Sequence, residues 1–404
     1  MTRRGIAFIV AGVALFFLSS ATQVGWVRIL DAMLWGMLLL SFVLQWLCTT
    51  AVDVRRRLLT SASARSLPGP MEEDVVEIET GLRNRRFWPR FFISVISRFP
   101  MESPDKQTQR YFVATLPSNE TTPVISKVHC YRRGMHHLPP ATIECKVPFG
   151  LLRRRKRLAA PLSILVYPKV YSMDHARLAS SLQGVSQMSR RSRTGQEAIG
   201  ARDFNPGDPV RLIHWRSSAR TRRLTVKEVE DTSHQSLTLA FSTAGSVGEG
   251  REATLEYAIK LAASIGVHTL RSGRAIELHA GDATGLWNDT EPFLKELALL
   301  EPSSSPALSG ILDAVSPSSL LIVILPDGDS AGADAIVRSA PRLPGVTAIV
   351  LTRFDDSAPG ASDRLTRAGI RVVECAPGQI EESLSQLGEP PSRTLPNARM
   401  AAAR

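Results

Sequence analysis

Two uncharged apolar runs lie close together near the start of the chain, at residues 5–21 and 32–52. A helix of about 20 apolar residues spans the hydrocarbon core of a bilayer, so both runs predict transmembrane helices. The first run, preceded by Arg3 and Arg4, also fits the pattern of a secretory signal. Because a second apolar run follows so soon, we interpret residues 1–57 as a retained transmembrane hairpin.

The basic residues around these runs predict their orientation. Arg55, Arg56 and Arg57 follow the second run, whereas the expected connecting loop carries Arg28 balanced by Asp31. The positive-inside rule then places the N- and C-termini in the cytoplasm. We therefore expect a multi-pass protein of a cell membrane, with two spans and a cytosolic body.

Short alternating segments follow a small, polar, proline-containing linker at residues 58–71. In residues 74–80 and 142–147, apolar and charged positions alternate with the period of a strand that has one buried face. Residues 111–116, 124–128 and 163–167 are further strand candidates between proline-containing turns. This spacing predicts a small antiparallel β-sandwich over residues 72–168.

The last third of the chain has a different pattern, in which strand-like and helix-like runs alternate. Apolar runs at residues 237–242, 275–280, 320–325, 346–351 and 370–375 predict strands, and residues 255–265 carry apolar positions at helical spacing. Such alternation predicts a doubly wound α/β domain over residues 235–387. Residues 388–404 are expected to form a disordered tail.

Composition adds two constraints. The net charge of +11 and a pI of about 9.9 favour an anionic neighbour, which can be acidic lipid, an acidic protein or nucleic acid. The four cysteines (Cys48, Cys130, Cys145 and Cys375) show no C-x-x-C spacing, so we expect buried thiols rather than a disulfide or a zinc site.

Arginine is concentrated between the two predicted domains, at residues 187–231. From Arg190 to Lys227 there are ten Arg or Lys and three Asp or Glu, a local charge of +7. Asn205, Pro206, Gly207 and Asp208 predict a turn, since proline presets φ and glycine permits positive φ. Arginine suits planar contacts with carboxylate or phosphate.

This segment resembles the signature of the domain-of-unknown-function 58 family (DUF58). The matching positions are Arg202, Pro206, Gly207, Asp208, Arg211, Ile213, Trp215, Ser218, Ala219, Arg220, Thr221, Leu224, Val226 and Glu228. Lys227 replaces the common arginine, and Asp203-Phe204 replaces a usual Glu-Tyr pair. Our candidate partner-binding residues are Arg202, Pro206, Gly207, Asp208, Arg211, His214, Trp215, Ser218, Arg220, Lys227 and Glu228.

The resemblance implies a bacterial membrane protein with a von Willebrand factor A-like domain after the signature. It also implies a MoxR-type AAA+ ATPase and a transglutaminase-like membrane protein as partners. The family brings no established reaction. The resemblance therefore predicts an architecture and a class of partner, but no substrate.

Metal binding is one test of that architecture. A working von Willebrand A domain holds a divalent cation through Asp-x-Ser-x-Ser after its first strand, because a hard cation needs clustered oxygen ligands. Here Ser242 and Thr243 are present but the Asp is absent, while Asp282 and Asp327 follow later strands. We expect a degenerate site, with no metal and no cofactor.

Catalysis is a second test. Asp208, His214 and Glu228 can be imagined as a catalytic cluster, with Arg211 and Arg220 stabilising an anion. No nucleophile lies at a defined spacing from a base, so we prefer a structural network in which Asp208 pairs with an arginine. We therefore expect no catalytic residues and no enzyme.

Three functions remain in competition. We favour a membrane-tethered adaptor that works with the ATPase in complex assembly or envelope function. The second is an enzyme acting on an anionic substrate bound at Arg211, Arg220 and Lys227. The third is a lipid- or nucleic-acid-binding module: the basic run at residues 153–157 faces anionic lipid or is a solvated loop. Nucleic acid is the least favoured, because Trp215 is the one aromatic residue between Phe204 and Phe241.

Overall fold

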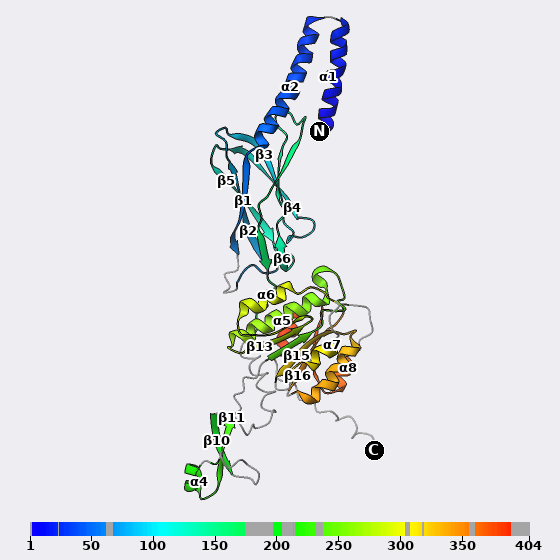
Figure 1. Cartoon of the computed structure of the whole chain (residues 1–404). Helices are drawn as coiled ribbons and strands as arrows, with labels where there is room; N and C mark the ends of the chain where they lie inside the picture. Colours follow the sequence, from blue (N-terminus) through cyan, green and yellow to red (C-terminus); the bar gives the residue numbers. More distant parts are fainter. Residues whose placement is uncertain are drawn as a thin grey trace. The chain divides into compact units, whose positions relative to one another are not determined.

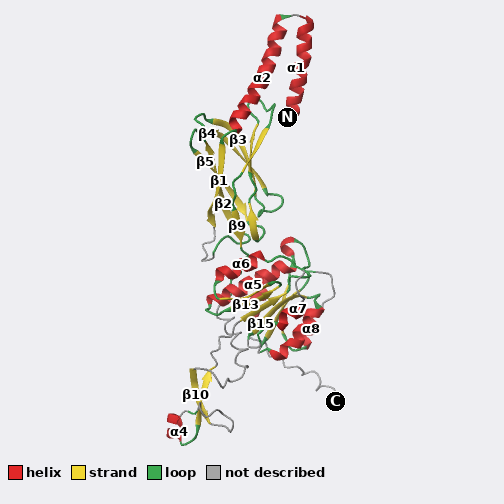
Figure 2. Cartoon of the chain, in the orientation of Figure 1, coloured by secondary structure: helices red, strands yellow, loops and turns green. Residues whose placement is uncertain are grey.

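The computed structural model describes residues 2–22, 24–61, 68–173, 197–203, 213, 215–230, 237–303, 308–316, 319–343, 345–354 and 360–388. The chain divides into two compact units, Met1–Tyr167 and Pro168–Arg404. Figures 1 and 2 show two long helices and a set of antiparallel strands in the first unit, and alternating helices and strands in the second.

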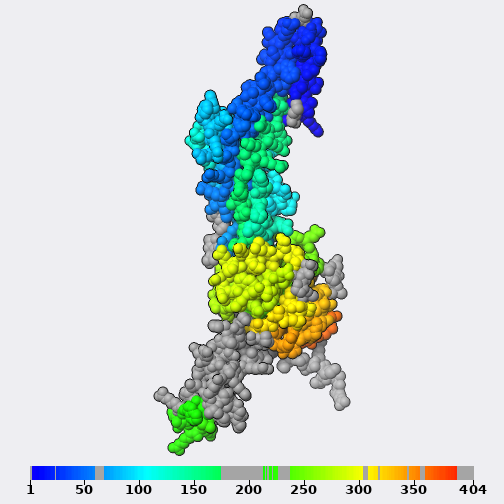
Figure 3. Space-filling model, in the orientation of Figure 1, coloured from blue at the N-terminus to red at the C-terminus, as the bar shows by residue number. Residues whose placement is uncertain are grey.

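Helices α1 (Arg3–Thr22) and α2 (Gly25–Thr49) pack side by side as a hairpin (Figure 3). Their mean hydropathies are 2.1 and 1.9, so both are long and apolar enough to cross a membrane. Close packing depends on Gly12, where a Cβ would lie 3.1 Å from the Leu34 side chain.

The start of the second helix was predicted incorrectly. Helix α2 begins at Gly25, so Arg28 and Asp31 lie in its first turns rather than in a connecting loop. A charged residue is compatible with the end of an apolar helix, because a long side chain such as that of Arg28 can extend toward water. Arg28 and Asp31 still balance each other in charge, because both lie in the first turns of α2.

The sheet-rich part of the first unit consists of antiparallel pairs. Its strands are β1 (Val52–Ser61), β2 (Val75–Asn84), β3 (Arg90–Arg98), β4 (Thr108–Leu116), β5 (Thr121–His129), β6 (Gly134–His137), β7 (Ala141–Cys145), β8 (Arg154–Leu158) and β9 (Ser163–Val166). They form three sheets in the orders β1-β2-β5, β4-β3-β7-β8 and β6-β9.

The first two of these sheets share one apolar core. Val54 and Leu82 of the first sheet pack with Val95 and Ile143 of the second, and all four are buried. Facing sheets that bury alternate residues against each other are the arrangement of a β-sandwich. This is the architecture expected for residues 72–168, although its first strand starts earlier.

Strand β1 corrects the expected linker. It starts at Val52 and pairs with β2 as far as Ser61, so residues 58–61 are strand rather than linker. The three arginines concealed the alternation, because the guanidinium of Arg56 is buried and donates to the Pro139 carbonyl at 2.7 Å and to Ser97 Oγ at 3.2 Å. Strand β8 likewise replaces the solvated loop that was one interpretation of the basic run at residues 153–157.

Several hydrogen bonds join the hairpin to the sandwich. Thr2 Oγ1, just before α1, donates to the Leu151 carbonyl at 2.5 Å, and Gln45 Nε2 of α2 donates to the Leu152 carbonyl at 2.6 Å. The Arg90 guanidinium donates to the Leu47 carbonyl. The buried thiols of Cys48 and Cys145 also hydrogen-bond across this junction, and that contact together with burial raises the pKa of Cys145. All four cysteines are free and buried, which confirms the expected thiols.

The second unit contains a six-stranded sheet in the order β14-β13-β12-β15-β16-β17. All neighbours are parallel except β14, which runs antiparallel to β13. The strands are β12 (Leu237–Phe241), β13 (Ile276–Ala280), β14 (Ala283–Trp287), β15 (Leu320–Pro326), β16 (Val346–Leu351) and β17 (Arg371–Cys375). Five coincide with the predicted runs; β14 was not predicted, because it is short and pairs through a tight turn at Gly281 and Asp282.

Helices cover both faces of this sheet. They are α5 (Thr254–Arg271), α6 (Thr290–Leu299) and α10 (Ile380–Leu387) on one face, and α7 (Leu308–Asp313), α8 (Ser330–Ser339) and α9 (Ala361–Arg367) on the other. Alternate strand residues such as Leu321, Val323 and Val350 pack against the second group. The arrangement is a doubly wound α/β sheet, in which the order of strand addition reverses between the parallel strands β12 and β15.

Candidate functional site

The signature segment forms a small module of two strands and one short helix. Strand β10 (Glu197–Asp203) pairs antiparallel with β11 (Thr225–Glu230), and helix α4 (Trp215–Thr221) lies between them in sequence. The register places Arg202 opposite Val226 and Ala201 opposite Lys227. The strand predicted over residues 224–229 therefore exists, with β10 as its partner.

One serine connects α4 to β11. Ser218 Oγ accepts a hydrogen bond from the Thr225 backbone N–H at 2.9 Å and lies 3.1 Å from Thr225 Oγ1. Both residues are buried, as is Ile213. The family-like positions Ser218 and Ile213 thus help to hold the module together.

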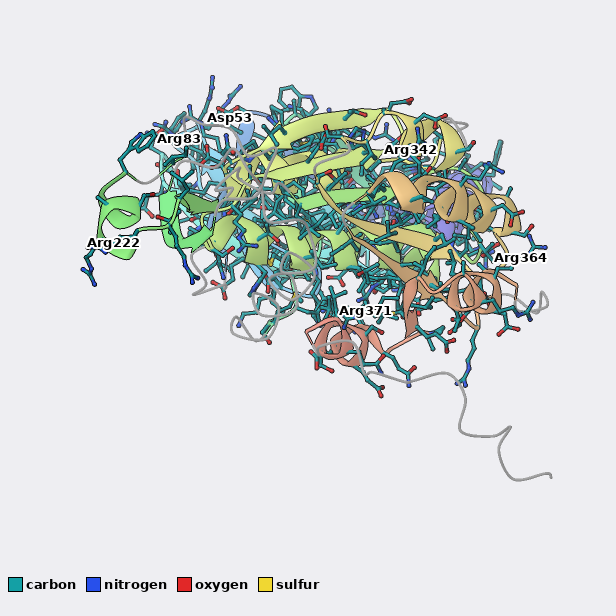
Figure 4. The ribbon with its side chains drawn as sticks, turned by 90° about the horizontal axis from the view of Figure 1, so that it is seen from below. Asp53, Arg83, Arg222, Arg342, Arg364 and Arg371 are labelled. Carbon is teal, nitrogen blue, oxygen red and sulfur yellow. The ribbon has the colours of Figure 1, made fainter. Side chains whose placement is uncertain are left out.

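Other signature side chains face solvent. Trp215 is 65% exposed and Leu224 is 48% exposed, although both are large and apolar. Arg220, on α4, and Arg222, directly after it, are exposed as well, and Figure 4 shows the Arg222 side chain directed away from the ribbon of its own module. We call Trp215, Arg220, Arg222 and Leu224 the module surface.

Arg222 has an unusual backbone conformation. It lies just after α4 with φ of 52°, in the left-handed region where glycine is the usual helix-ending residue. A non-glycine residue pays about 1 kcal/mol or more in that region. A conformation of this kind at an exposed basic residue is a pointer to function rather than stability.

The remaining predicted site residues fall elsewhere. Pro206, Gly207, Asp208, Arg211 and His214 lie outside the described residues, so the expected Asp208–arginine pair stays a prediction. For Arg202, Lys227 and Glu228 the structure describes the backbone, in β10 and β11. Trp215, Ser218 and Arg220 come together on α4.

A second candidate site lies at the carboxyl ends of the parallel strands. A cavity of about 440 Å³ is lined by Ser242 after β12, Asp327 and Asp329 after β15, and Arg353 and Phe354 after β16. Doubly wound sheets bind ligands where the strand order reverses, and this cavity lies at that point. Arg353 is also left-handed, with φ of 62°.

The aspartates of this cavity cap helices. Asp327 Oδ1 accepts the backbone N–H groups of Ala361 at 3.1 Å and Ser362 at 3.0 Å, at the start of α9. Asp329 Oδ1 accepts the N–H of Gly332 at 2.8 Å, at the start of α8. Carboxylates at these positions are stabilised by the helix dipole. The part of the chain with described coordinates contains no cluster of three or more His, Cys, Asp or Glu residues suited to a metal.

The hydroxyl groups near the first strand also have local partners. Ser242 Oγ accepts the Ala244 N–H at 3.1 Å, and Thr243 Oγ1 lies 3.0 Å from Ser303 Oγ. Among the described residues lining the cavity there is no His or Cys. The cavity therefore offers an arginine, two capping carboxylates and hydroxyls, with no nucleophile paired to a base.

Sequence reasoning missed the aromatic side of this cavity. Phe354 packs edge-on against Tyr257 with ring centroids 4.7 Å apart. Burial, together with donation to Glu252, raises the pKa of Tyr257 to about 12, so its hydroxyl stays protonated. The same hydroxyl accepts the Gly378 N–H at 2.9 Å. No sequence motif singled out these residues, because their partners are distant along the chain.

Comparisons with known proteins identify a family match for only part of the chain. No curated protein sequence matches it. A GH20 exo-β-N-acetylglucosaminidase from Vibrio harveyi is similar at 10% identity over 80% of this chain and 76% of that chain, with a TM-score of 0.21. The sporulation control protein Spo0M from Bacillus subtilis is similar at 12% identity over 38% and 58%, with a TM-score of 0.15. Scores this low carry no argument about fold or activity.

The family comparison falls on the module and the first half of the α/β sheet. Residues 200–290 match the family described as "Protein of unknown function DUF58". The matched stretch runs from within β10 through α4, β11, β12, α5 and β13 to β14. The match over these residues supports the assignment of the chain to the DUF58 family.

Proposed function

We propose that the protein is a membrane-tethered adaptor that binds its partner through the module surface. The observation that carries the proposal is the exposure of Trp215 and Leu224 beside exposed arginines, within the stretch that matches the family. Tryptophan and arginine are enriched at the energetic centres of protein interfaces. The basic charge fits a partner surface that is acidic.

The rest of the chain supports a tether. Helices α1 and α2 cross the membrane in this proposal, with both termini cytoplasmic. Hydrogen bonds from Thr2, Gln45 and Arg90 connect the hairpin to the sandwich. A partner held by the module would thereby stay at the membrane.

The α/β unit is a von Willebrand A-like domain with a degenerate metal site in this proposal. Its central β12 and antiparallel edge strand β14 support that assignment. The capping roles of Asp327 and Asp329 support a non-catalytic, metal-free edge. On this view the protein is not an enzyme.

The partner we propose is a MoxR-type AAA+ ATPase, as the resemblance implies, with a transglutaminase-like membrane protein as a further member of the assembly. The test is binding of the purified ATPase to the detergent-extracted full chain. Trp215→Ala should weaken binding about tenfold or more, the effect of removing an interface hot spot. Leu224→Ala should weaken it by less, because leucine is under-represented among hot spots.

The matched control is Leu286→Ala. Leu286 is 62% exposed on the edge strand β14, so it is another surface leucine of the same unit. Binding and melting temperature should stay at wild-type values. Equal binding by wild type, Trp215→Ala and Leu224→Ala would refute the module surface as the docking site.

A further inference from the structure

The outer face of the sheet β4-β3-β7-β8 carries an unusual charge cluster. Glu144 on β7 is 1% exposed, although it lies on the side of the sheet away from the core. Four cations cover its carboxylate: Arg153 at 2.6 Å, Arg155 at 2.7 Å, Lys146 at 3.2 Å and Arg110 at 3.5 Å. One carboxylate among four cations leaves a surplus of three positive charges in this cluster.

These cations remain accessible. The side chains of Arg110, Lys146 and Arg155 are each about half exposed, at 49%, 48% and 51%, and that of Arg153 is 33% exposed. Like charges held within one cluster repel one another, and a second anion would relieve that repulsion. Arginine presents a planar fork that matches the oxygens of a phosphate.

Three exposed phenylalanines lie close to this cluster, on the strands β3 and β4. Phe91, Phe92 and Phe112 are 44%, 50% and 65% exposed. Phe92 stacks with Phe112 at 6.1 Å between ring centroids and contacts Phe91 at 6.4 Å. Phe112 pairs with Ser94, which pairs on its other side with Glu144, so rings and cations adjoin. Phe92 has φ of 55°, a costly conformation for a bulky residue.

This face adjoins the ends of the two apolar helices. Leu152, the residue before Arg153, accepts its hydrogen bond from Gln45 near the end of α2, and Leu151 accepts from Thr2 at the start of α1. Strand β3 carries Phe91 and Phe92. Its first residue, Arg90, donates a hydrogen bond to the Leu47 carbonyl of α2. If the hairpin spans a bilayer, aromatic rings and cations at this level meet the headgroup layer.

We propose that this face binds the phosphate groups of anionic phospholipid, with the four cations as the phosphate site and the three rings resting in the interfacial layer. The inference rests on the proposed membrane tether. The occupant is a lipid surface because the surplus charge lies beside exposed rings and continues directly from the helices that would enter the bilayer. Binding would hold the sandwich at the membrane surface through a second contact besides the hairpin.

The test measures thermal melting of the detergent-extracted full chain with added short-chain phosphatidylglycerol. Phosphatidylglycerol should raise the melting temperature of the wild type, whereas short-chain phosphatidylcholine should leave it unchanged. Arg153→Gln with Arg155→Gln should weaken the apparent affinity about 25-fold, from about fivefold for each charge near the surface. Because Arg153 and Arg155 lie closest to Glu144, at 2.6 and 2.7 Å, and Arg110 lies 3.5 Å from it, Arg110→Gln provides a milder variant, with about a fivefold loss expected.

The matched control replaces Arg342 and Arg364 by Gln. Both are exposed arginines in surface ion pairs of the second unit, with Asp313 and Asp334, and both are labelled in Figure 4. This variant should respond to phosphatidylglycerol like the wild type. Phe92→Ser with Phe112→Ser should reduce the response while leaving all four cations in place.

Four results would overturn the proposal. A wild type that does not respond to phosphatidylglycerol, or cluster variants that respond like the wild type, would remove the lipid site. An equal response to inorganic phosphate would identify a free-phosphate site, and an equal response to polyglutamate would identify an acidic protein as occupant. The tether is tested separately: resistance of the wild type to alkaline extraction from membranes reports the hairpin, whatever the lipid response in detergent.

Discussion

The guanidinium of Arg90, at the first position of β3, donates a hydrogen bond to the backbone carbonyl of Leu47 in the last turn of α2. It also donates to Asn84 Oδ1 at 2.8 Å, and the arginine is 4% exposed. The last carbonyls of a helix have no partner within the helix, so a side chain has to supply one. Arg90 therefore joins three elements, α2, β2 and β3, at the base of the hairpin.

Replacing Arg90 by Ala should destabilise the first unit by about 2–3 kcal/mol. The substitution removes the charged donor to the Leu47 carbonyl and to the buried Asn84 Oδ1, which is costlier than losing an exposed contact. Thermal melting of the detergent-extracted chain measures the change. Arg98→Ala is the control from the other end of β3, where the exposed guanidinium donates to the Gln107 side chain, and it should stay within about 0.5 kcal/mol of wild type.

The Glu144 cluster predicts a pH dependence of stability. Burial alone would raise the pKa of this carboxyl, but hydrogen bonds from Arg155 and Lys146 and the charge of Arg110 outweigh it, and the pKa is lowered. The charged carboxylate therefore stabilises the fold above its unfolded pKa of about 4.3, and that contribution is lost as the pH falls through the lower folded value.

Glu144→Gln should accordingly melt below the wild type at neutral pH, and the difference should shrink below about pH 4. Glu77→Gln is the control, since Glu77 forms a surface ion pair with Lys127 at 3.6 Å. Its difference from wild type should be small at every pH. A wild-type advantage over Glu144→Gln that is constant down to low pH would show that the carboxylate has no favourable charge interaction.

Much of the fold was predictable, because apolar periodicity reports burial directly. The strands β15 and β16 are continuous apolar runs, and the spacing of Leu255, Ile259 and Ala262 predicted α5. Strands β1 and β8 were missed because basic residues occupy both their inward and their outward positions, as Arg56 does beside Arg55 and Arg57 in β1. Their character depends on partners distant in sequence, such as Glu144 for β8 and Pro139 for β1.

The candidate site was predictable only in part. The resemblance singled out Trp215 and Ser218. It did not predict that Trp215 faces solvent or that Ser218 hydrogen-bonds to Thr225. The helix α4 could not be predicted from apolar spacing, because its seven residues are too few to show a helical period. The contact between the rings of Phe92 and Phe112 also carried no sequence signal, since it depends on the pairing of β3 with β4.

Arg222→Gly separates a binding role from a structural one. Glycine adopts positive φ without a steric penalty, so the variant should keep the melting temperature or raise it slightly, by at most about 1 kcal/mol of stability. Binding of the ATPase should weaken severalfold, because the exposed guanidinium is lost. A variant that binds like the wild type would show that Arg222 is not part of the docking surface.

Orientation in the membrane can be tested at Val24, in the turn between α1 and α2. A Val24→Cys variant should react with an impermeant thiol reagent added outside intact cells, since the four native cysteines are buried and provide little background. A reporter fused after Arg404 should behave as cytoplasmic. Digestion of the body by protease added outside intact cells would contradict this orientation.

The last prediction concerns the carboxyl edge of the α/β sheet, where Asp327 either caps a helix or holds a cation. As a cap, its Oδ1 needs only to accept the N–H groups of Ala361 and Ser362. Asp327→Asn keeps an acceptor and should change stability little, whereas Asp327→Ala should cost about 1 kcal/mol.

Adding Mg²⁺ or Mn²⁺ distinguishes the two roles. A metal-free edge predicts no change in the melting temperature of the detergent-extracted wild type at millimolar ion. A ligand for a hard cation contributes through its charge. Stabilisation by more than about 1 kcal/mol in the wild type, lost in Asp327→Asn, would require the ion to exceed its dissociation constant severalfold. That result would restore a metal site at this edge of the sheet.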